Sequence, residues 1–149
     1  MATYATDIVE TSKPAPTGSS GAEVLAVRGV VTLPTTLAIN ELVKCAILPA
    51  GHIPVDVILD VDDLDTGGAP AITLTAAVLN AGLTDIEAGT NFFTASTVAQ
   101  AGGLARMDLK TGPRLASSTS DRYVGLKVVA AGQTPAAGVV GFTLLYRPA

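Results

Sequence analysis

The sequence predicts an all-β fold, an antiparallel β-sandwich of jelly-roll type, preceded by an extended N-terminal arm. About eight short segments rich in Val, Ile, Leu and Thr follow one another, and Gly, Pro, Asn or Asp bounds each of them. Hydrophobic residues make up 48% and charged residues 15% of the 149 positions, which is enough for the core of one domain. We therefore expect an arm over residues 1–21 and a single β-sandwich domain over residues 22–149.

The arm is predicted from its composition. Pro14, Pro16, Gly18 and Gly21 stand among Ser and Thr, so the second half of the arm is unsuited to a helix or a central strand. Two interpretations remain open: the arm packs against a neighbouring molecule, or it frays as a free tail.

The strands are predicted from hydrophobic alternation. Residues 55–61 show it best, with Val55, Val57, Leu59 and Val61 expected on one face of the sheet. The expected strands comprise residues 23–33, 41–48, 55–61, 71–79, 92–93, 103–107, 123–130 and 138–147.

At most one short helix is expected, over residues 94–101. Thr94 or Ser96 would cap its start, and Gly102 with Gly103 would end it. Such a helix would have one or two turns.

The charge pattern limits the partners. A net charge of −4 gives no general attraction for phosphate backbones, so we expect no free nucleic acid as a main partner. Residues 41–90 are acidic and residues 101–149 are basic on balance. This asymmetry either matches unlike surfaces of neighbouring subunits or simply solvates separate loops.

We expect no membrane partner either. The N-terminal residues lack the basic start and apolar stretch of a signal peptide. Glycine, proline and asparagine interrupt the charge-free runs before they reach the roughly 20 predominantly apolar residues of a spanning helix. Self-association is a natural way to cover the apolar surface of such a chain.

The acidic segment over residues 60–68 is the sharpest local feature. Asp60, Asp62, Asp63 and Asp65, followed by Gly67, loosely resemble a loop that supplies oxygen ligands to calcium. The spacing differs from an EF-hand, which needs a glutamate at its twelfth position. The other interpretation, which we favour, is a polar loop whose Asp side chains bind nearby backbone amides, without a metal.

No catalytic or cofactor-binding constellation is evident. The single histidine, His52, rules out a multi-histidine zinc site within one chain, and the single cysteine, Cys45, lies in an apolar run. The sequence has no nucleophile elbow and no glycine-rich phosphate loop. We therefore expect a protein that is not an enzyme and has no cofactor.

Several segments resemble a known family. They comprise residues 48–65, 71–75, 78–80, 97–103, 120–127 and 141–147. Together they are similar to the head decoration (cement) proteins of tailed bacteriophages. The resemblance implies a small β-rich protein, commonly a homotrimer, that is made in the bacterial host cytoplasm and sits on the outer capsid surface of the virion. Its partner would be the major capsid protein, and its function would be to stabilise the shell by bridging capsid subunits.

The expected capsid or subunit interface combines the arm with the acidic segment, namely Thr3, Tyr4, Asp7, Ile8 and Lys13 with Asp60, Asp62, Asp63 and Asp65. Two alternatives stay open besides an enzyme centred on His52. One is another phage structural component, such as a tail-tube, head-completion or fibre-base protein. The other is a calcium-dependent carbohydrate-binding β-sandwich module.

Overall fold

The computed structural model describes residues 2–11, 15, 17 and 23–149. Short loops separate most of its strands, as the Gly- and Pro-rich boundaries in the sequence predict. The elements are β1 (Thr3–Ala5), α1 (Asp7–Glu10), β2 (Leu25–Leu33), β3 (Leu42–Leu48), β4 (His52–Val61), β5 (Thr73–Val78), β6 (Phe93–Ser96), the 3-10 turn η1 (Val98–Gln100), β7 (Gly103–Arg106), β8 (Arg122–Ala130) and β9 (Gly138–Pro148).

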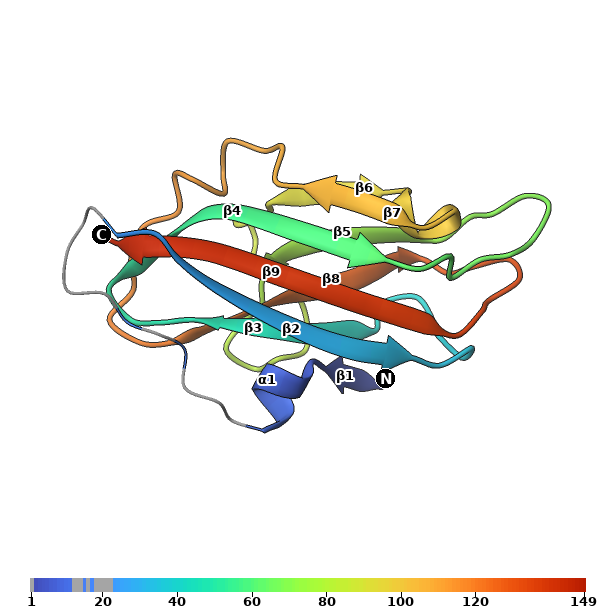
Figure 1. Cartoon of the computed structure of the whole chain (residues 1–149), viewed down its shortest axis with the longest axis horizontal. Helices are drawn as coiled ribbons and strands as arrows, with labels where there is room; N and C mark the ends of the chain where they lie inside the picture. Colours follow the sequence, from blue (N-terminus) through green and yellow to red (C-terminus); the bar gives the residue numbers. More distant parts are fainter. Residues whose placement is uncertain (1, 12–14, 16, 18–22) are drawn as a thin grey trace.

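The strands form two sheets that pack face to face (Figure 1). One has the order β1-β3-β8-β5-β6 and the other the order β2-β9-β4-β7. Strand β2 pairs with β9, β3 with β8, β4 with β7, and β5 with β6, all antiparallel. The first of these eight strands thus pairs with the last, the second with the seventh, and so on inwards. This is the topology of a long hairpin rolled into an eight-stranded jelly roll. The predicted fold class is confirmed.

The core lies between the sheets and is built from alternate side chains of each strand. Its largest fully buried members are Phe92, Phe93, Phe142 and Tyr146. Along β4, the residues Val57, Leu59 and Val61 face this core, as the alternation predicts.

The prediction for Val55 is wrong. The register between β4 and β9 shifts between Pro54 and Asp56, and Val55 is exposed. A bulge adds one residue to a strand and so reverses the face of the residues before it.

The predicted helix over residues 94–101 is replaced by strand β6 and the single turn η1. Pairing of β6 with β5 at the sheet edge prevails over the weak local helix signal, and the Ala95 amide donates a hydrogen bond to the Thr75 hydroxyl at 2.9 Å. Gly102 follows the turn with a φ of 76°, a conformation that favours glycine. The helical turn therefore ends at Gly102, as the sequence predicts. The four-residue α-helix of the structure lies instead at the N-terminus, in α1.

Residues 2–11 of the predicted arm cover one open side of the sandwich (Figure 1). Strand β1 extends the five-stranded sheet by parallel pairing with β3, and α1 then lies beside β2 and β3. This part of the arm therefore packs on its own chain. Lys13, Pro14 and Pro16 lie outside the described residues, and the division at residue 21 stays a prediction.

The loops gather at the two ends of the sandwich (Figure 1). The loops over residues 34–41, 62–72, 97–102 and 131–137 share one end, at the right in the figure, which we call the loop end. Among the helices of the described residues, none is long and apolar enough to cross a membrane.

Candidate interaction surfaces

Asp65 fastens two loops of the loop end together. Its carboxylate is buried and accepts hydrogen bonds of 2.6–3.2 Å from four backbone amides, those of Ala71, Ile72, Gln133 and Thr134. Burial alone would raise the pKa of this carboxyl, but the four amides outweigh it and hold the pKa well below its ordinary value. The charged carboxylate therefore joins the β4–β5 loop to the β8–β9 loop.

The neighbouring acids also bind the backbone. Asp62 accepts a hydrogen bond of 2.8 Å from the Val139 amide, and Asp63 accepts one of 2.9 Å from the Asp65 amide. The interpretation as a polar loop that binds backbone amides is confirmed for Asp62, Asp63 and Asp65 but not for Asp60, which lies in β4. Within the described ranges, no group of three or more His, Cys, Asp or Glu is placed to hold a metal ion.

Asp60 has a different role, on the outer face of the four-stranded sheet. It forms an ion pair with Arg28 of β2, and one of the hydrogen bonds between them measures 3.0 Å. The guanidinium crosses over Gly141, where any Cβ would overlap it. The hydrogen bonds that the Arg28 guanidinium donates to Asp60 are the main reason that the pKa of Arg28 is raised.

Ion pairs also join the acidic and basic parts of the chain to each other. Asp56 on β4 pairs with Arg106 on β7, and Asp85 pairs with Lys127 on β8 at 2.6 Å. Both pairs link an acid from residues 41–90 to a base from residues 101–149. Part of the charge asymmetry seen in the sequence is thus matched within one molecule.

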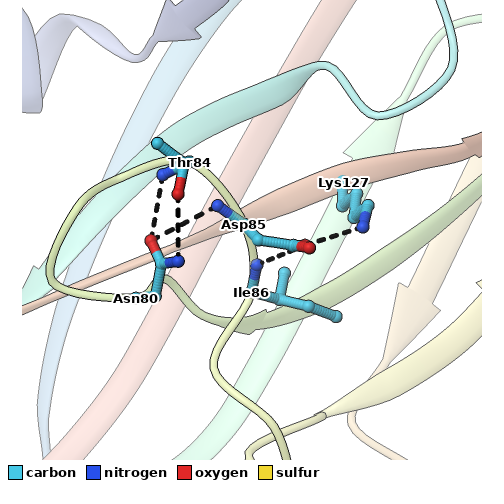
Figure 2. A network of polar contacts seen from close by, with 5 residues as sticks. All are labelled: Asn80, Thr84, Asp85, Ile86 and Lys127. Carbon is cyan, nitrogen blue, oxygen red and sulfur yellow. Dashed lines mark hydrogen bonds and ion pairs between the residues drawn. The ribbon is translucent and has the colours of Figure 1, made fainter.

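The Asp85–Lys127 pair fastens the β5–β6 loop to strand β8 (Figure 2). Asn80 supports the turn: its Oδ1 accepts hydrogen bonds from the amides of Thr84 and Asp85 at 2.9 and 3.3 Å. The Lys127 ammonium, and then the Ile86 amide, lower the pKa of Asp85. Sequence reasoning missed this network, because Asp85 and Lys127 are 42 positions apart.

The N-terminal candidates lie along the edges of both sheets. Thr3 and Tyr4 belong to β1, and Ile8 of α1 is buried in the core. Asp7 accepts a hydrogen bond of 2.7 Å from the Val30 amide of β2. Thr6, which the sequence did not single out, is fully buried and donates its hydroxyl hydrogen bond to the Cys45 carbonyl of β3. The segment thus links the edge of one sheet to the edge of the other.

His52 and Cys45 are both buried. The His52 ring meets Tyr146 edge to face at 5.5 Å, and its Nδ1 lies 2.9 Å from the Ala50 carbonyl oxygen. Burial raises the pKa of the Cys45 thiol well above its ordinary value. Both side chains therefore pack in the interior of the fold and have a structural role.

Comparison with known proteins gives matches among solved structures. No protein-family model and no curated protein sequence matches the chain. Solved structures do, and two of them match over more than nine-tenths of the chain. A chain described as "Capsid of Ralstonia phage GP4" is 35% identical, with a TM-score of 0.88 over 99% of both chains. A chain described as "Cyanophage Pam1 capsid asymmetric unit" is 33% identical, with a TM-score of 0.71 over 91% of this chain and 92% of that one.

The chain belongs to a family of bacteriophage capsid proteins. At that level the resemblance found in the sequence is confirmed, and the protein is a phage structural protein of the virion. The resembling segments coincide with most of β4 and β9 and with parts of β5 and β8. These strands form the centre of both sheets, so the resemblance follows the framework of the fold.

Proposed function

We propose that this capsid protein is a decoration protein, which binds the outer capsid surface and stabilises the shell by bridging subunits of the major capsid protein. The observation that carries the proposal is the match over 99% of both chains to a chain of the GP4 capsid. A chain of this fold is therefore present in that capsid structure. The resemblance of the sequence to decoration proteins narrows the role further.

Bridging requires a rigid body with contact sites that face different neighbours. The N-terminal segment, with exposed Thr3 and Asp7, lies along the edges formed by β2 and β3, and Asp60 reaches β2 through its ion pair with Arg28. Asp62 and Asp63 follow β4 at the loop end. Tyr4 and Ile8 hold the first site against the core, and Asp65 holds the second against the β8–β9 loop. Lys13, which follows this segment in the sequence, stays a candidate residue of the interface. The sandwich between them transmits force without any chemistry, so the proposed role needs neither enzyme activity nor a cofactor.

The test is binding to heads assembled from the phage's own major capsid protein without this chain. We expect the purified full chain to cosediment with expanded heads until the sites are saturated, and to raise the temperature at which the heads open. In the infected cell, the protein would be made in the host cytoplasm and would bind to the outer surface of the head after the head has assembled.

One result would contradict the proposal, and a second would change only its interface. Failure to bind heads, together with binding to isolated tails or incorporation into tube-like polymers, would assign the chain to another part of the virion. A variant lacking residues 1–11 that remained folded and bound heads as tightly as the full chain would remove the N-terminal segment from the interface. A Thr3→Lys, Asp7→Lys double variant tests the same site with the segment in place.

A further inference from the structure

A pocket of about 520 Å³ lies between the β5–β6 loop and the start of β8. Its size falls within the range of small-molecule sites, about 300–1,000 Å³. The residues that line it include the apolar Leu79, Leu83 and Tyr123 and the charged Glu87, Asp121 and Arg122. The proposed decoration function makes no use of this pocket.

Both walls of the pocket are held in place before any ligand binds. On the β5–β6 loop, the Asn80 side chain binds the turn from within, and Asp85 ties the loop to Lys127 of β8 at 2.6 Å (Figure 2). On the other wall, Asp121 accepts a hydrogen bond of 2.8 Å from the Ala50 amide. A pocket that is already ordered loses little conformational entropy on binding, which favours affinity.

The pocket also carries two unfavourable features. Leu83 has a φ of 52°, a conformation that non-glycine residues rarely adopt. The Arg122 guanidinium donates through one Nη to the Ala116 carbonyl at 2.9 Å, but its buried Nε has no hydrogen-bond partner among the described residues. Backbone strain gathers at ligand-binding sites, and an unpaired buried donor costs free energy. A ligand oxygen that drew the guanidinium towards the pocket would give Nε its missing acceptor.

The charges around the pocket exclude several classes of ligand. Two carboxylates, Glu87 and Asp121, line it with one guanidinium, so an anion would meet an excess of negative charge. A metal ion is disfavoured as well, since no group of three His, Cys, Asp or Glu in the described part of the chain is placed to hold one. A wholly apolar ligand would take the polar groups out of water without pairing them.

A neutral ligand with several hydroxyl groups meets all of these constraints. A hydroxyl donates to a carboxylate such as that of Glu87 and accepts from the Arg122 guanidinium, and the exposed Ser120 hydroxyl can do either. Leu83 and Tyr123 supply apolar surface for the C–H groups of such a ligand.

We propose that this pocket binds a neutral sugar residue without a metal ion. The site is distinct from the acidic segment over residues 60–68, which suggested a calcium-dependent module. The inference does not depend on the proposed decoration function, because it concerns the free protein.

The experiment is a titration of the full, ¹⁵N-labelled chain, followed by amide and arginine Nε–H chemical shifts. The neutral probes are D-glucose, L-rhamnose and N-acetyl-D-glucosamine, and the anionic probes are D-glucuronate and inorganic phosphate, each up to tens of millimolar. We expect at least one neutral sugar to shift the signals of residues 79–87 and 118–123 and the Arg122 Nε–H in a saturable way. A chelator should leave this binding unchanged.

A matched pair of variants locates the site. Ala81 lines the pocket and is exposed, whereas Ala101 is an exposed alanine at the loop end. Ala81→Leu should weaken binding of the sugar about tenfold or more, because the larger side chain occupies space that the ligand needs. Ala101→Leu should bind like the parent. Glu87→Ala, which removes a charged acceptor, should weaken binding about tenfold, and the unfolding temperature of each variant checks that it is folded.

The proposal is overturned if none of the neutral sugars gives saturable shifts around the pocket, or if Ala81→Leu and Ala101→Leu have equal effects. Preferential binding of glucuronate or phosphate would make the pocket an anion site, and loss of binding with a chelator would make it a metal site; either result refutes the assignment. If no sugar binds and Ala81→Leu abolishes binding to heads, the pocket holds a side chain of the shell protein, and the sugar site is refuted while the decoration role stands.

Discussion

Ile8→Ala tests whether the N-terminal segment is part of the folded domain. Ile8 lies in α1, is 9% exposed and packs into the core cluster between the sheets. Its neighbours in the chain are held by backbone pairing of β1 with β3 and by the hydrogen bond of Asp7 to β2. If these contacts exist in solution, removing the buried atoms must lower the free energy of unfolding.

The expected loss is about 2 kcal/mol. Truncation of a buried Ile to Ala in a core costs about 2–5 kcal/mol, and a site that can collapse falls at the low end of that range. Ile8 belongs to a four-residue helical turn at the margin of the core, so its surroundings can relax. For a domain of about 150 residues, 1 kcal/mol shifts Tm by about 2–4 °C, so we expect Tm to fall by about 4–8 °C.

The assay is urea or thermal unfolding of the full chain, with Val24→Ala as the control. Val24 is 55% exposed, and its truncation should change stability by no more than about 0.5 kcal/mol. Equal stability of Ile8→Ala and Val24→Ala would show that the segment is a frayed tail and would refute the reasoning. A loss for Ile8→Ala that varied with protein concentration would also contradict it, because the contacts described here lie within one chain.

Three further predictions follow from buried groups. Gly125→Ala should destabilise the protein by about 1–3 kcal/mol in a urea titration, because a Cβ there would overlap the Val43 carbonyl. The control Gly82→Ala should be neutral in the same titration, because a Cβ there makes only ordinary contacts. Burial raises the pKa of Tyr146 to about 12. In an absorbance titration one tyrosine should therefore ionise near pH 12, and Tyr146→Phe should remove that step. Because the folded pKa exceeds the ordinary value of about 10, the associated stability is present below pH 10 and is lost as pH rises towards 12. Cys45 should react with a thiol reagent only on unfolding, since its burial disfavours the thiolate. Rapid labelling of the native protein would contradict its buried position.

Much of the sandwich could be predicted because the signal is local. The alternation of Val57, Leu59 and Val61 with more polar residues fixes which face of β4 is buried, and Gly or Pro marks most strand ends. The prediction of a helix over residues 94–101 was wrong because non-local contacts decide the structure there. Its local signal was weak, and the hydrogen bonds offered by the edge of β5 decided the outcome.

The candidate surfaces were predicted less completely. The sequence drew attention to Asp62, Asp63 and Asp65, and it allowed for backbone hydrogen bonding, but it could not identify the amides. Gln133 and Thr134 are 68 and 69 positions from Asp65 along the chain.

By itself, the sequence determined the all-β class, most strand positions and the resemblance to phage structural proteins, because each depends on residue types and their local order. Only the tertiary structure decided the nesting of β2 with β9 and β3 with β8, the docking of α1 on its own chain, and the inward direction of Asp65. These features depend on pairing between distant strands, whose favourable contacts exist only after the whole sandwich has closed.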